Sequence, residues 1–509
     1  MKYVSSFIII FLSSMLPVWS QTYAVSIGAN VTPAVRSGFD PDARLFLFFS
    51  KYEFSPPYTQ IWPNGGNAIF AKNLHWSPDQ HLVISDLTDW SKTPTWDLNG
   101  VPSGTYYVQI LWDQDQTESR IDAPGNLISE VKKIELSSDT HLQFNLQEII
   151  PERTLIDNPL VKYFEITSDT LSAWWGKPMK IKASILLPSG YYDHPDATYP
   201  VRYHVAGYGG RYTRINRVMN PENPFSSWWT SGEAPQIITI YLDGEGPYGD
   251  SYQLDSDNSG PYGYALTHEL GPKIETMYHG AGTPQLRFVD GCSTGGWVSL
   301  ALQLYYPDFF NGCWSYSPDA IEFNNYQLIN IYKDKNAFIN EYDLERPVMR
   351  ETSGEPMMLM REFITYENVQ GKTNTYVTSG GQFSAHTALY SPKGKDGLPA
   401  PLFDPFTGEI DHEVAEYWKK YDLTMYTKEN WPELGPRLQG KVNIWMGDMD
   451  NFYLNLGTRA FDEFIQSTEN PHSDAVIRFT PMKGHCAEYD QRTILEEMAQ
   501  KIESMHLKG

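Results

Sequence analysis

Three short segments, far apart in the chain, hold side chains that together can cleave an acyl bond. The first, GCSTG at residues 291–295, places a serine between two glycines. The second, GDMD at residues 447–450, holds two acids, and the third, KGHC at residues 483–486, holds a histidine. A serine hydroxyl becomes a nucleophile when a histidine accepts its proton and a carboxylate orients that histidine. The three segments therefore predict acyl transfer through a serine.

Ser293 has the sequence context of a sharp turn between a strand and a helix. The apolar segment LRFVD before it predicts a strand, and WVSLALQLYY after it predicts a helix. A G-x-S-x-G motif at such a junction exposes the serine oxygen, and the glycines leave room for the turn. Because the motif alone is weak evidence, this context is what favours Ser293 as the nucleophile over a buried structural serine.

His485 is the expected base. In this kind of fold the catalytic residues follow one another as serine, acid and histidine, and His485 comes after the last predicted strand, AVIRFT, and before a predicted helix. The chain has twelve histidines, and His204 and His386 are the alternatives.

Asp450 is the expected acid. It follows the predicted strand KVNIWMG, and α/β sheets build their sites just beyond the carboxyl ends of their strands. Asp450 stands three residues after Gly447, a spacing that clears the end of the strand. Asp448 is the alternative, and either acid can instead cap the helix that follows.

Two backbone N–H groups are expected to stabilise the negative oxygen of the tetrahedral intermediate. One is the N–H of Thr294, directly after the nucleophile. The other belongs to the glycine-rich loop after the predicted strand YPVRYHVAG, where Tyr208 is favoured and Gly209 is the alternative. This chemistry requires no metal and no other cofactor.

Two of the three cysteines flank the predicted serine and histidine: Cys292 and Cys486. A triad brings the serine and histidine side chains within about 3 Å, so the adjacent backbones come close enough for a bridge with Cα atoms about 5.5 Å apart. We therefore predict a Cys292–Cys486 disulfide, with two buried thiols as the alternative. Cys313 is expected to remain a free, buried thiol.

The elements that must position these residues belong to an α/β domain at residues 155–509. Strand-like and helical segments alternate there, which predicts crossover connections and a mostly parallel sheet. Residues 317–438 show no clear strand pattern and are expected to form an insertion or lid over the site.

The N-terminal part predicts a different architecture. Residues 21–150 contain short apolar segments separated by turns, which indicates an all-β sandwich of the immunoglobulin-like kind. Residues 1–20 combine a lysine, a short apolar run and small residues near the end, which predicts a cleaved signal peptide and a secreted protein, extracellular or periplasmic; a membrane anchor is the alternative.

The composition agrees with a folded, exported chain of two domains. It has 509 residues, of which 41% are hydrophobic and 20% charged, typical of a globular protein. The formal net charge of −23 repels nucleic acid and anionic membranes. Nucleic acid and membranes are therefore not expected as partners, and no oligomeric state is predicted.

From about residue 155 to the end, the chain resembles the secreted esterases of the α/β-hydrolase superfamily. The group includes esterase D, enterochelin esterase, and the feruloyl and acetyl-xylan esterases of carbohydrate esterase family one. The motifs that carry the resemblance are HVAGYGG, DSDNSGPYGYALTHELGPKIE, DGCSTGGW, GDMDNFYLN and KGHC. The cysteine pattern is also similar to the CS-D-HC arrangement of tannase-type feruloyl esterases, in which a disulfide joins the two cysteines. The resemblance implies a serine carboxylic-ester hydrolase of the feruloyl or acetyl esterase type. Its expected substrate is a small-molecule or polysaccharide-linked ester, found on polysaccharides or among related plant or algal esters.

Three other interpretations remain. Glucuronoyl esterases also have a cysteine before the serine, but they place arginine where this chain has Thr294. A serine peptidase of the prolyl-oligopeptidase type has the same triad, yet about 130 N-terminal residues suffice for only about three propeller blades. The third alternative is a binding module on an inactive hydrolase scaffold, against which the intact set of serine, acid and histidine argues.

Aromatic residues near these motifs form a pool that can stack on a sugar or a phenolic group. The pool comprises Trp228, Trp229, Trp297, Trp314 and the tyrosines of GPYGDSY and GPYGY. Each of them is expected on its own to serve core or lid packing, and the β-sandwich is expected to brace the catalytic domain.

Overall fold

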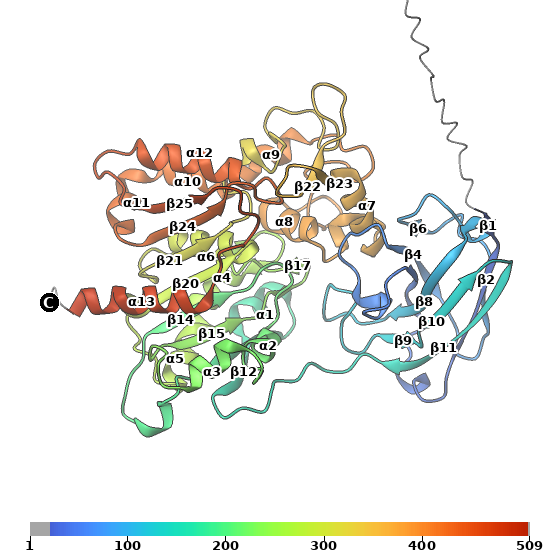
Figure 1. Cartoon of the computed structure of the whole chain (residues 1–509), viewed down its shortest axis with the longest axis horizontal. Coiled ribbons are helices and arrows are strands. Elements are labelled where there is room, and N and C mark those ends of the chain that lie inside the picture. Colours follow the sequence, from blue (N-terminus) through green and yellow to red (C-terminus); the bar gives the residue numbers. More distant parts are fainter. Residues whose placement is uncertain (1–20, 507–509) are drawn as a thin grey trace, which may run out of the picture.

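The computed structural model describes residues 21–506, which form a β domain and a larger α/β domain (Figure 1). The strands of the β domain lie within residues 22–149, and the sheet of the α/β domain begins at Val161. The predicted signal peptide, residues 1–20, lies outside the described residues. Within residues 21–506, each helix is too short or too polar to cross a lipid bilayer.

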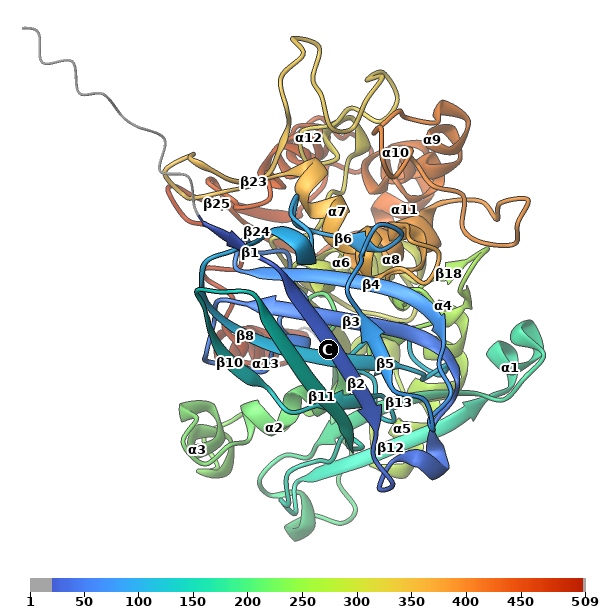
Figure 2. The same cartoon turned by 90° about the vertical axis from the view of Figure 1, so that its right-hand side faces the viewer.

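The β domain is built from one continuous sheet that folds back on itself. Its strands are β1 (Thr22–Tyr23), β2 (Val25–Val31), β3 (Asp42–Ser50), β4 (Asn67–His75), β5 (Leu82–Ile84), β6 (Ser91–Lys92), β7 (Val101–Pro102), β8 (Gly104–Asp113), β9 (Leu127–Ser129), β10 (Lys132–Leu136) and β11 (Thr140–Ile149). Nine of these strands form the sheet, in the order β5-β2-β11-β9-β8-β3-β4-β6 with β10 beside β8, and β1 pairs with β7. Figure 2 shows β2 and β11 lying across β3, β4 and β8. The immunoglobulin-like assignment stays a prediction.

Strand β3 is buried on both faces, and its alternating side chains explain why. Leu45, Leu47 and Phe49 fill the core between the two layers of the β domain. Phe46 and Phe48 point the opposite way and belong to a second apolar cluster that includes Tyr366 and Val369 of the α/β domain. The β domain is therefore joined to its neighbour by a hydrophobic core.

The α/β domain has a mostly parallel sheet, as predicted. Its strands are β12 (Val161–Ser168), β13 (Met179–Leu186), β14 (Val201–Val205), β15 (Ile238–Leu242), β20 (Arg287–Cys292), β21 (Cys313–Tyr316), β24 (Val442–Gly447) and β25 (Val476–Thr480). Their order is β12-β13-β15-β14-β20-β21-β24-β25. β13 runs antiparallel to both of its neighbours, β12 and β15, and the other neighbouring strands pair in parallel. The segments YPVRYHVAG, LRFVD, KVNIWMG and AVIRFT, predicted as strands, form β14, β20, β24 and β25. The edge strand β12 and the four-residue β21 were not predicted.

Helices surround this sheet. They are α1 (Asp169–Trp175), α2 (Ile215–Val218), α3 (Pro224–Thr230), α4 (Tyr262–Tyr264), α5 (Gly271–Met277), α6 (Thr294–Tyr305), α7 (Met360–Gln370), α8 (Gln382–Tyr390), α9 (His412–Trp418), α10 (Leu423–Glu429), α11 (Trp431–Leu438), α12 (Asn455–Gln466) and α13 (Gln491–His506). Short ribbons add β16 (Glu245–Gly246) with β17 (Gly249–Asp250), β18 (Asp255–Ser256) with β19 (Gly260–Pro261), and β22 (Pro347–Arg350) with β23 (Pro356–Leu359).

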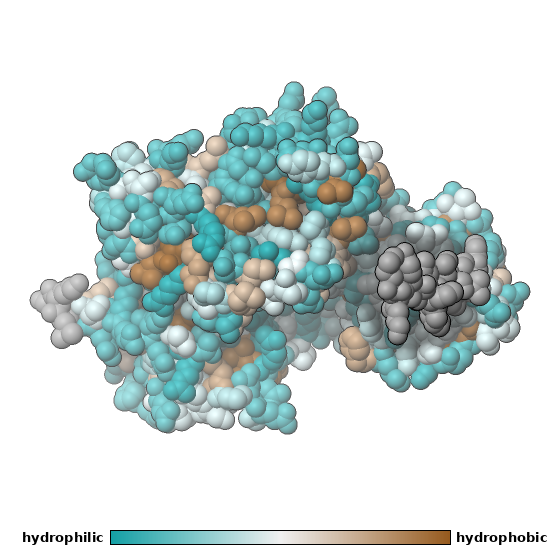
Figure 3. Space-filling model, turned by 45° about the horizontal axis from the view of Figure 1, so that its top comes forward, coloured by the Kyte–Doolittle hydropathy of each residue, from teal (hydrophilic) through white to brown (hydrophobic). Residues whose placement is uncertain are grey.

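The segment predicted as an insertion carries helices α7–α11 and the hairpin β22–β23. This hairpin was not predicted, because its four-residue strands each begin with a proline and give little alternating pattern. Figure 1 shows α7 beside the β domain, where Tyr366 and Val369 pack. The insertion thus lies against both domains. The face drawn in Figure 3 is mostly hydrophilic with smaller hydrophobic patches.

Candidate active site

Ser293 lies at the turn between β20 and α6, in a backbone conformation that few residues with a side chain adopt. Its φ is 64° and its ψ is −127°, and such strain is typical of functional turns. The flanking glycines are required here. A Cβ atom at Gly295 would lie 2.1 Å from the carbonyl oxygen of Val205, and one at Gly291 would lie 2.4 Å from the same atom. The tight packing of strand, turn and helix presents Ser293 to a cavity.

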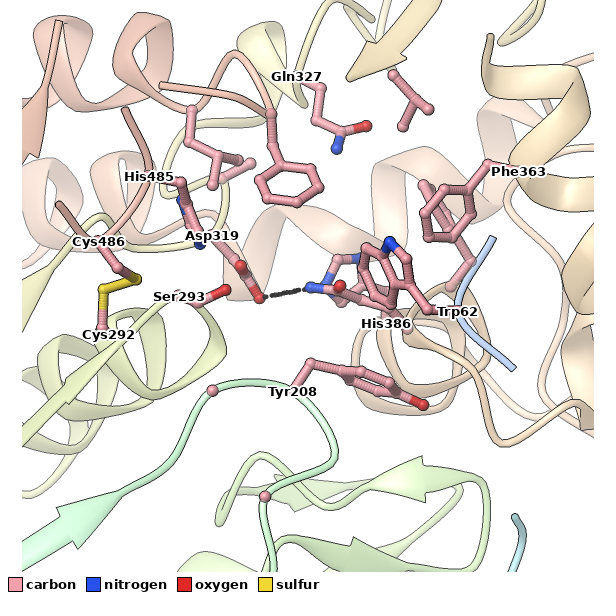
Figure 4. A pocket seen from close by; sticks show the side chains of 18 of the residues that line it. Trp62, Tyr208, Cys292, Ser293, Asp319, Gln327, Phe363, His386, His485 and Cys486 are labelled. Carbon is pink, nitrogen blue, oxygen red and sulfur yellow. Dashed lines mark hydrogen bonds and ion pairs between the residues drawn. A yellow bond between two sulfur atoms is a disulfide. The ribbon is translucent and has the colours of Figure 1, made fainter. Parts of the chain in front are cut away.

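His485 lies at the same cavity and is oriented by Asp450. The Nδ1 atom of His485 is 2.7 Å from Oδ2 of Asp450, whose other oxygen accepts the backbone N–H of Phe452 at 2.9 Å. Because Asp450 binds Nδ1, the second ring nitrogen, Nε2, remains available for proton transfer. Nε2 is buried and has no hydrogen-bond partner among the described residues. Figure 4 shows His485 close to Ser293.

Asp448, the alternative acid, does not contact His485. Its carboxylate pairs with the guanidinium of Arg459 on helix α12, and its side chain is partly exposed, whereas Asp450 is fully buried. The residue that orients His485 is therefore Asp450.

The two alternative histidines occupy different places. His204 lies buried in β14, with Nδ1 3.4 Å from Oδ2 of Asp290, and burial lowers the pKa of His204 to about 4. His386 on α8 does line the cavity, but its Nε2 is 3.5 Å from Oδ2 of Asp319. His386 therefore belongs to a second pair of histidine and acid in the same cavity.

Asp319, which was not predicted from the sequence, is a buried carboxylate next to Ser293. Its Oδ2 accepts the hydroxyl of Tyr252 at 2.8 Å, the hydroxyl of Thr294 at 2.9 Å and the amide of Gln382 at 3.1 Å. Burial alone would raise the pKa of Asp319, but His386 and these donors outweigh it and hold the pKa below its ordinary value. Asp319 follows strand β21, so recognising CWSY as a strand would have placed it at the functional edge of the sheet.

The two acids also act on His485. Burial disfavours the charged imidazolium, but the negative charges of Asp450 and Asp319 outweigh burial, so the pKa of His485 is raised above its ordinary value of 6.5. The ring of Phe452 packs edge-on against the imidazole, with ring centroids 4.9 Å apart.

The expected oxyanion donors lie on either side of Ser293. Thr294 is the first residue of α6, and the first N–H groups of a helix have no intrahelical acceptor. The loop after β14 turns sharply at Gly209, whose φ is 69°, and a Cβ atom at Gly207 would lie 3.6 Å from the Cβ of Ser293. The loop thus passes directly beside Ser293, and the donor roles of Tyr208 and Thr294 stay a prediction.

A disulfide joins Cys292 and Cys486, with the Cα atoms 6.0 Å apart. It links the residue before Ser293 to the residue after His485, as Figure 4 shows. Cys313 is a free, buried thiol, and burial raises its pKa to about 12.

Removing this disulfide is expected to destabilise the protein strongly. The bridge closes a loop of 194 residues, which the chain-entropy model values at up to about 5 kcal/mol. The double variant Cys292→Ala/Cys486→Ala should therefore show a lower free energy of unfolding in guanidinium chloride. Thiol titration of the denatured, unreduced native protein should find one thiol, and the control variant Cys313→Ala should have none; three thiols in the native protein would refute the bridge.

The cavity at Ser293 has a volume of about 370 Å³ and is lined by both polar and apolar side chains. The polar side chains that line it include Asp319, Gln327, Gln382 and His386, and the apolar ones include Trp62, Val348, Phe363, Phe383, Phe452 and Leu454. Figure 4 shows Trp62 and Phe363 across the cavity from Ser293.

The predicted tryptophan pool does not form these walls. Trp228, Trp229, Trp297 and Trp314 are buried in the main core. Trp297, for example, donates its indole N–H to the carbonyl of Ala320 at 3.1 Å. Their proximity to the motifs in sequence reflects core packing, because large apolar side chains next to a buried strand or helix fill the interior.

Comparison with models of protein families matches residues 177–493 to the family described as "Putative esterase". No curated protein matches the chain in sequence. Among solved structures, the chain is similar to a ferulic acid esterase, with 16% identity, 68% of this chain and 98% of that chain covered, and a TM-score of 0.40. It is also similar to an S-formylglutathione hydrolase from Agrobacterium tumefaciens (13% identity, 67% and 94% covered, TM-score 0.39). A prolyl endopeptidase is similar over 86% of this chain and 49% of that chain, with 10% identity and a TM-score of 0.34.

The family match covers more than half of the chain and includes the serine turn, the loop after β24 and His485. The parallel sheet with its strand-turn-helix at Ser293 agrees with that family's fold. The chain therefore belongs to the family described as "Putative esterase", and it is a carboxylic ester hydrolase with the α/β-hydrolase fold.

Proposed function

We propose that this protein is a secreted serine esterase that removes acyl groups, of the feruloyl or acetyl type, from polysaccharides or related plant or algal esters. The observation that carries the proposal is the bond from His485 to Asp450, which leaves Nε2 of His485 free at the cavity that also contains Ser293. This is the arrangement that activates a serine hydroxyl.

The reaction follows from these positions. The Oγ atom of Ser293 attacks the ester carbonyl while Nε2 of His485 takes its proton, and Asp450 holds the imidazole through Nδ1–H. The N–H groups of Thr294 and Tyr208 stabilise the oxyanion. The imidazolium then protonates the leaving alkoxide. Water, activated by His485 in the same way, releases the acyl group from Ser293 and restores the hydroxyl.

Export of the protein rests on the predicted signal peptide and on the disulfide. Structural disulfides persist in oxidising compartments and are rare in the cytosol, and Cys292 is joined to Cys486. An enzyme outside the cytosol can reach polymeric esters, which agrees with the proposed substrate class.

A hydrolysis panel tests the function. It contains methyl ferulate, acetylated xylan, a methyl glucuronate ester and short p-nitrophenyl esters, and peptide anilides are included because the same triad cleaves amides. We expect hydrolysis of the feruloyl or acetyl esters and none of the anilides. Cleavage of the anilides in preference to every ester would contradict the proposal.

The rate should fall at acidic pH because His485 must be neutral to accept a proton. Its pKa is raised by Asp450 and Asp319, so the acidic limb of kcat/KM should have its midpoint above 6.5. Asp319→Asn removes one negative charge, lowers the pKa of His485 and should move the limb to lower pH.

The control for this pH shift is Asp308→Asn, which removes an exposed carboxylate paired with Arg437 outside the cavity. Its pH profile should match that of the native protein. An unchanged limb in Asp319→Asn would show that Asp319 does not act on His485.

A further inference from the structure

One wall of the catalytic cavity comes from the β domain. Trp62 lies in the connection between β3 and β4 and lines the cavity together with Ser293 and His485. Figure 4 shows Trp62 on the side of the cavity opposite to Ser293. A residue more than two hundred positions before the nucleophile therefore takes part in shaping the site.

The indole of Trp62 is only partly covered by protein. It meets Phe363 with ring centroids 5.3 Å apart and an interplanar angle of 87°, and Phe452 at 6.3 Å and 86°. Both contacts are edge-to-face, and Trp62 as a whole remains 40% exposed. Part of the ring is thus available to a ligand in the cavity.

The position of Trp62 is fixed by helix α7 of the insertion. The carbonyl of Ile61, directly before it, accepts the side-chain amide of Gln370 at 3.0 Å. The hydroxyl of Tyr366 donates to the carbonyls of Asn64 and, at 3.0 Å, of Asn67. Hydrogen bonds on both sides of Trp62 hold the loop in place. Because the loop is already ordered, little conformational entropy is lost when the indole packs against a ligand.

One side chain, that of Phe452, connects Trp62 to His485. Phe452 contacts Trp62 on one side and the imidazole of His485, at 4.9 Å between ring centroids, on the other. A group that rests on Trp62 therefore lies near enough to the reacting atoms for its packing to position the ester bond.

We propose that Trp62 is a specificity-determining residue of this esterase, and that the β domain takes part in substrate binding rather than only bracing the catalytic domain. The ligand chemistry is a ring with a flat apolar face, which an aromatic side chain packs against. Such a ring is supplied either by a phenolic acyl group or by the sugar on the alcohol side. The inference rests on the proposed esterase function.

The test compares three esters that place the ring differently. Ethyl acetate has no ring, methyl ferulate has one on the acyl side, and an acetylated xylooligosaccharide has its rings on the alcohol side. For Trp62→Ala we expect kcat/KM to fall roughly ten-fold or more on at least one ring-bearing ester and to change less than two-fold on ethyl acetate. Trp62→Phe keeps a flat ring and should recover much of the loss.

The matched control is Trp174→Ala. Trp174 is similarly exposed, at 48%, and lies on α1 outside the cavity. It should leave kcat/KM unchanged on all three esters, and the thermal unfolding temperatures of all variants should be measured alongside.

The outcomes separate the sources of the ring. A loss on methyl ferulate assigns Trp62 to the acyl group, and a loss on the xylooligosaccharide assigns it to the sugar. An equal loss on all three esters makes Trp62 structural and overturns the inference, as does no loss on any of them. A native protein without activity on any ester would contradict the esterase function itself, and the inference with it.

Discussion

Replacing Ser293 by alanine should lower kcat for ester hydrolysis by about a million-fold, close to the loss seen when a whole triad is removed. In the proposed mechanism the Oγ atom of Ser293 is the protein atom that bonds to the acyl group, and the alanine variant has no such atom at this position. Activity that remains would come from oxyanion stabilisation and substrate binding. The measurement is kcat on a p-nitrophenyl ester, combined with labelling by phenylmethylsulfonyl fluoride, which should modify Ser293 in the native protein and nothing in the variant.

Ser299→Ala is the matched control for this substitution. Ser299 lies on α6, the helix that begins directly after Ser293, is buried, and donates its hydroxyl to the carbonyl of Gly296 at 2.9 Å. Its loss disturbs the helix without touching the cavity, so activity and labelling should remain. Ser293 would not be the nucleophile if Ser293→Ala kept a tenth of the native kcat. The same would follow if phenylmethylsulfonyl fluoride labelled another residue.

The surroundings of Ser293 could be predicted from sequence because they are local. The apolar strand, the two glycines and the apolar helix are consecutive, and each has its own physical reason. Gly295, for example, has no room for a side chain beside the carbonyl of Val205. The same holds for Asp450 and His485, each of which follows its strand within a few residues.

Asp319 and Trp62 could not be found in this way. Strand β21 has only four residues, too few for a clear pattern, so Asp319 read as part of an unstructured insertion. Trp62 reaches the cavity because the β domain packs against helix α7, where Phe46 and Phe48 meet Tyr366 and Val369. This contact joins segments about three hundred residues apart. Local patterns give no information about such pairings.

The β domain contacts both the predicted oxyanion loop and the insertion. The guanidinium of Arg120 donates to the carbonyl of Gly209 at 3.4 Å, and that of Arg44 donates to the carbonyl of Val369 at 2.8 Å. The hydroxyl of Tyr208 reaches across to the carbonyl of Gly380 in the insertion. The bonds of Arg120 and Tyr208 hold the loop that is expected to place an N–H beside Ser293. They are a physical basis for the bracing role expected from sequence.

Asp450→Asn should lower kcat by about 10⁴-fold while leaving the fold intact. The carboxylate of Asp450 accepts Nδ1–H of His485 at 2.7 Å and backbone N–H groups through its other oxygen. An amide of the same size keeps the backbone bonds but presents an NH₂ group to Nδ1, which selects the tautomer with the proton on Nε2. His485 can then no longer accept the proton of Ser293. Because substrate contacts do not change, KM should stay within about two-fold.

Asp448→Asn is the control for this prediction, since Asp448 stands two residues earlier and pairs with Arg459 at the surface. Exposed ion pairs contribute little to stability, and this one does not touch His485, so kcat should change less than two-fold. The two variants carry the same chemical change, and only their positions differ. If Asp448→Asn lost more activity than Asp450→Asn, the acid that orients His485 in the working enzyme would be Asp448, and the loop after β24 would have to rearrange before the reaction begins.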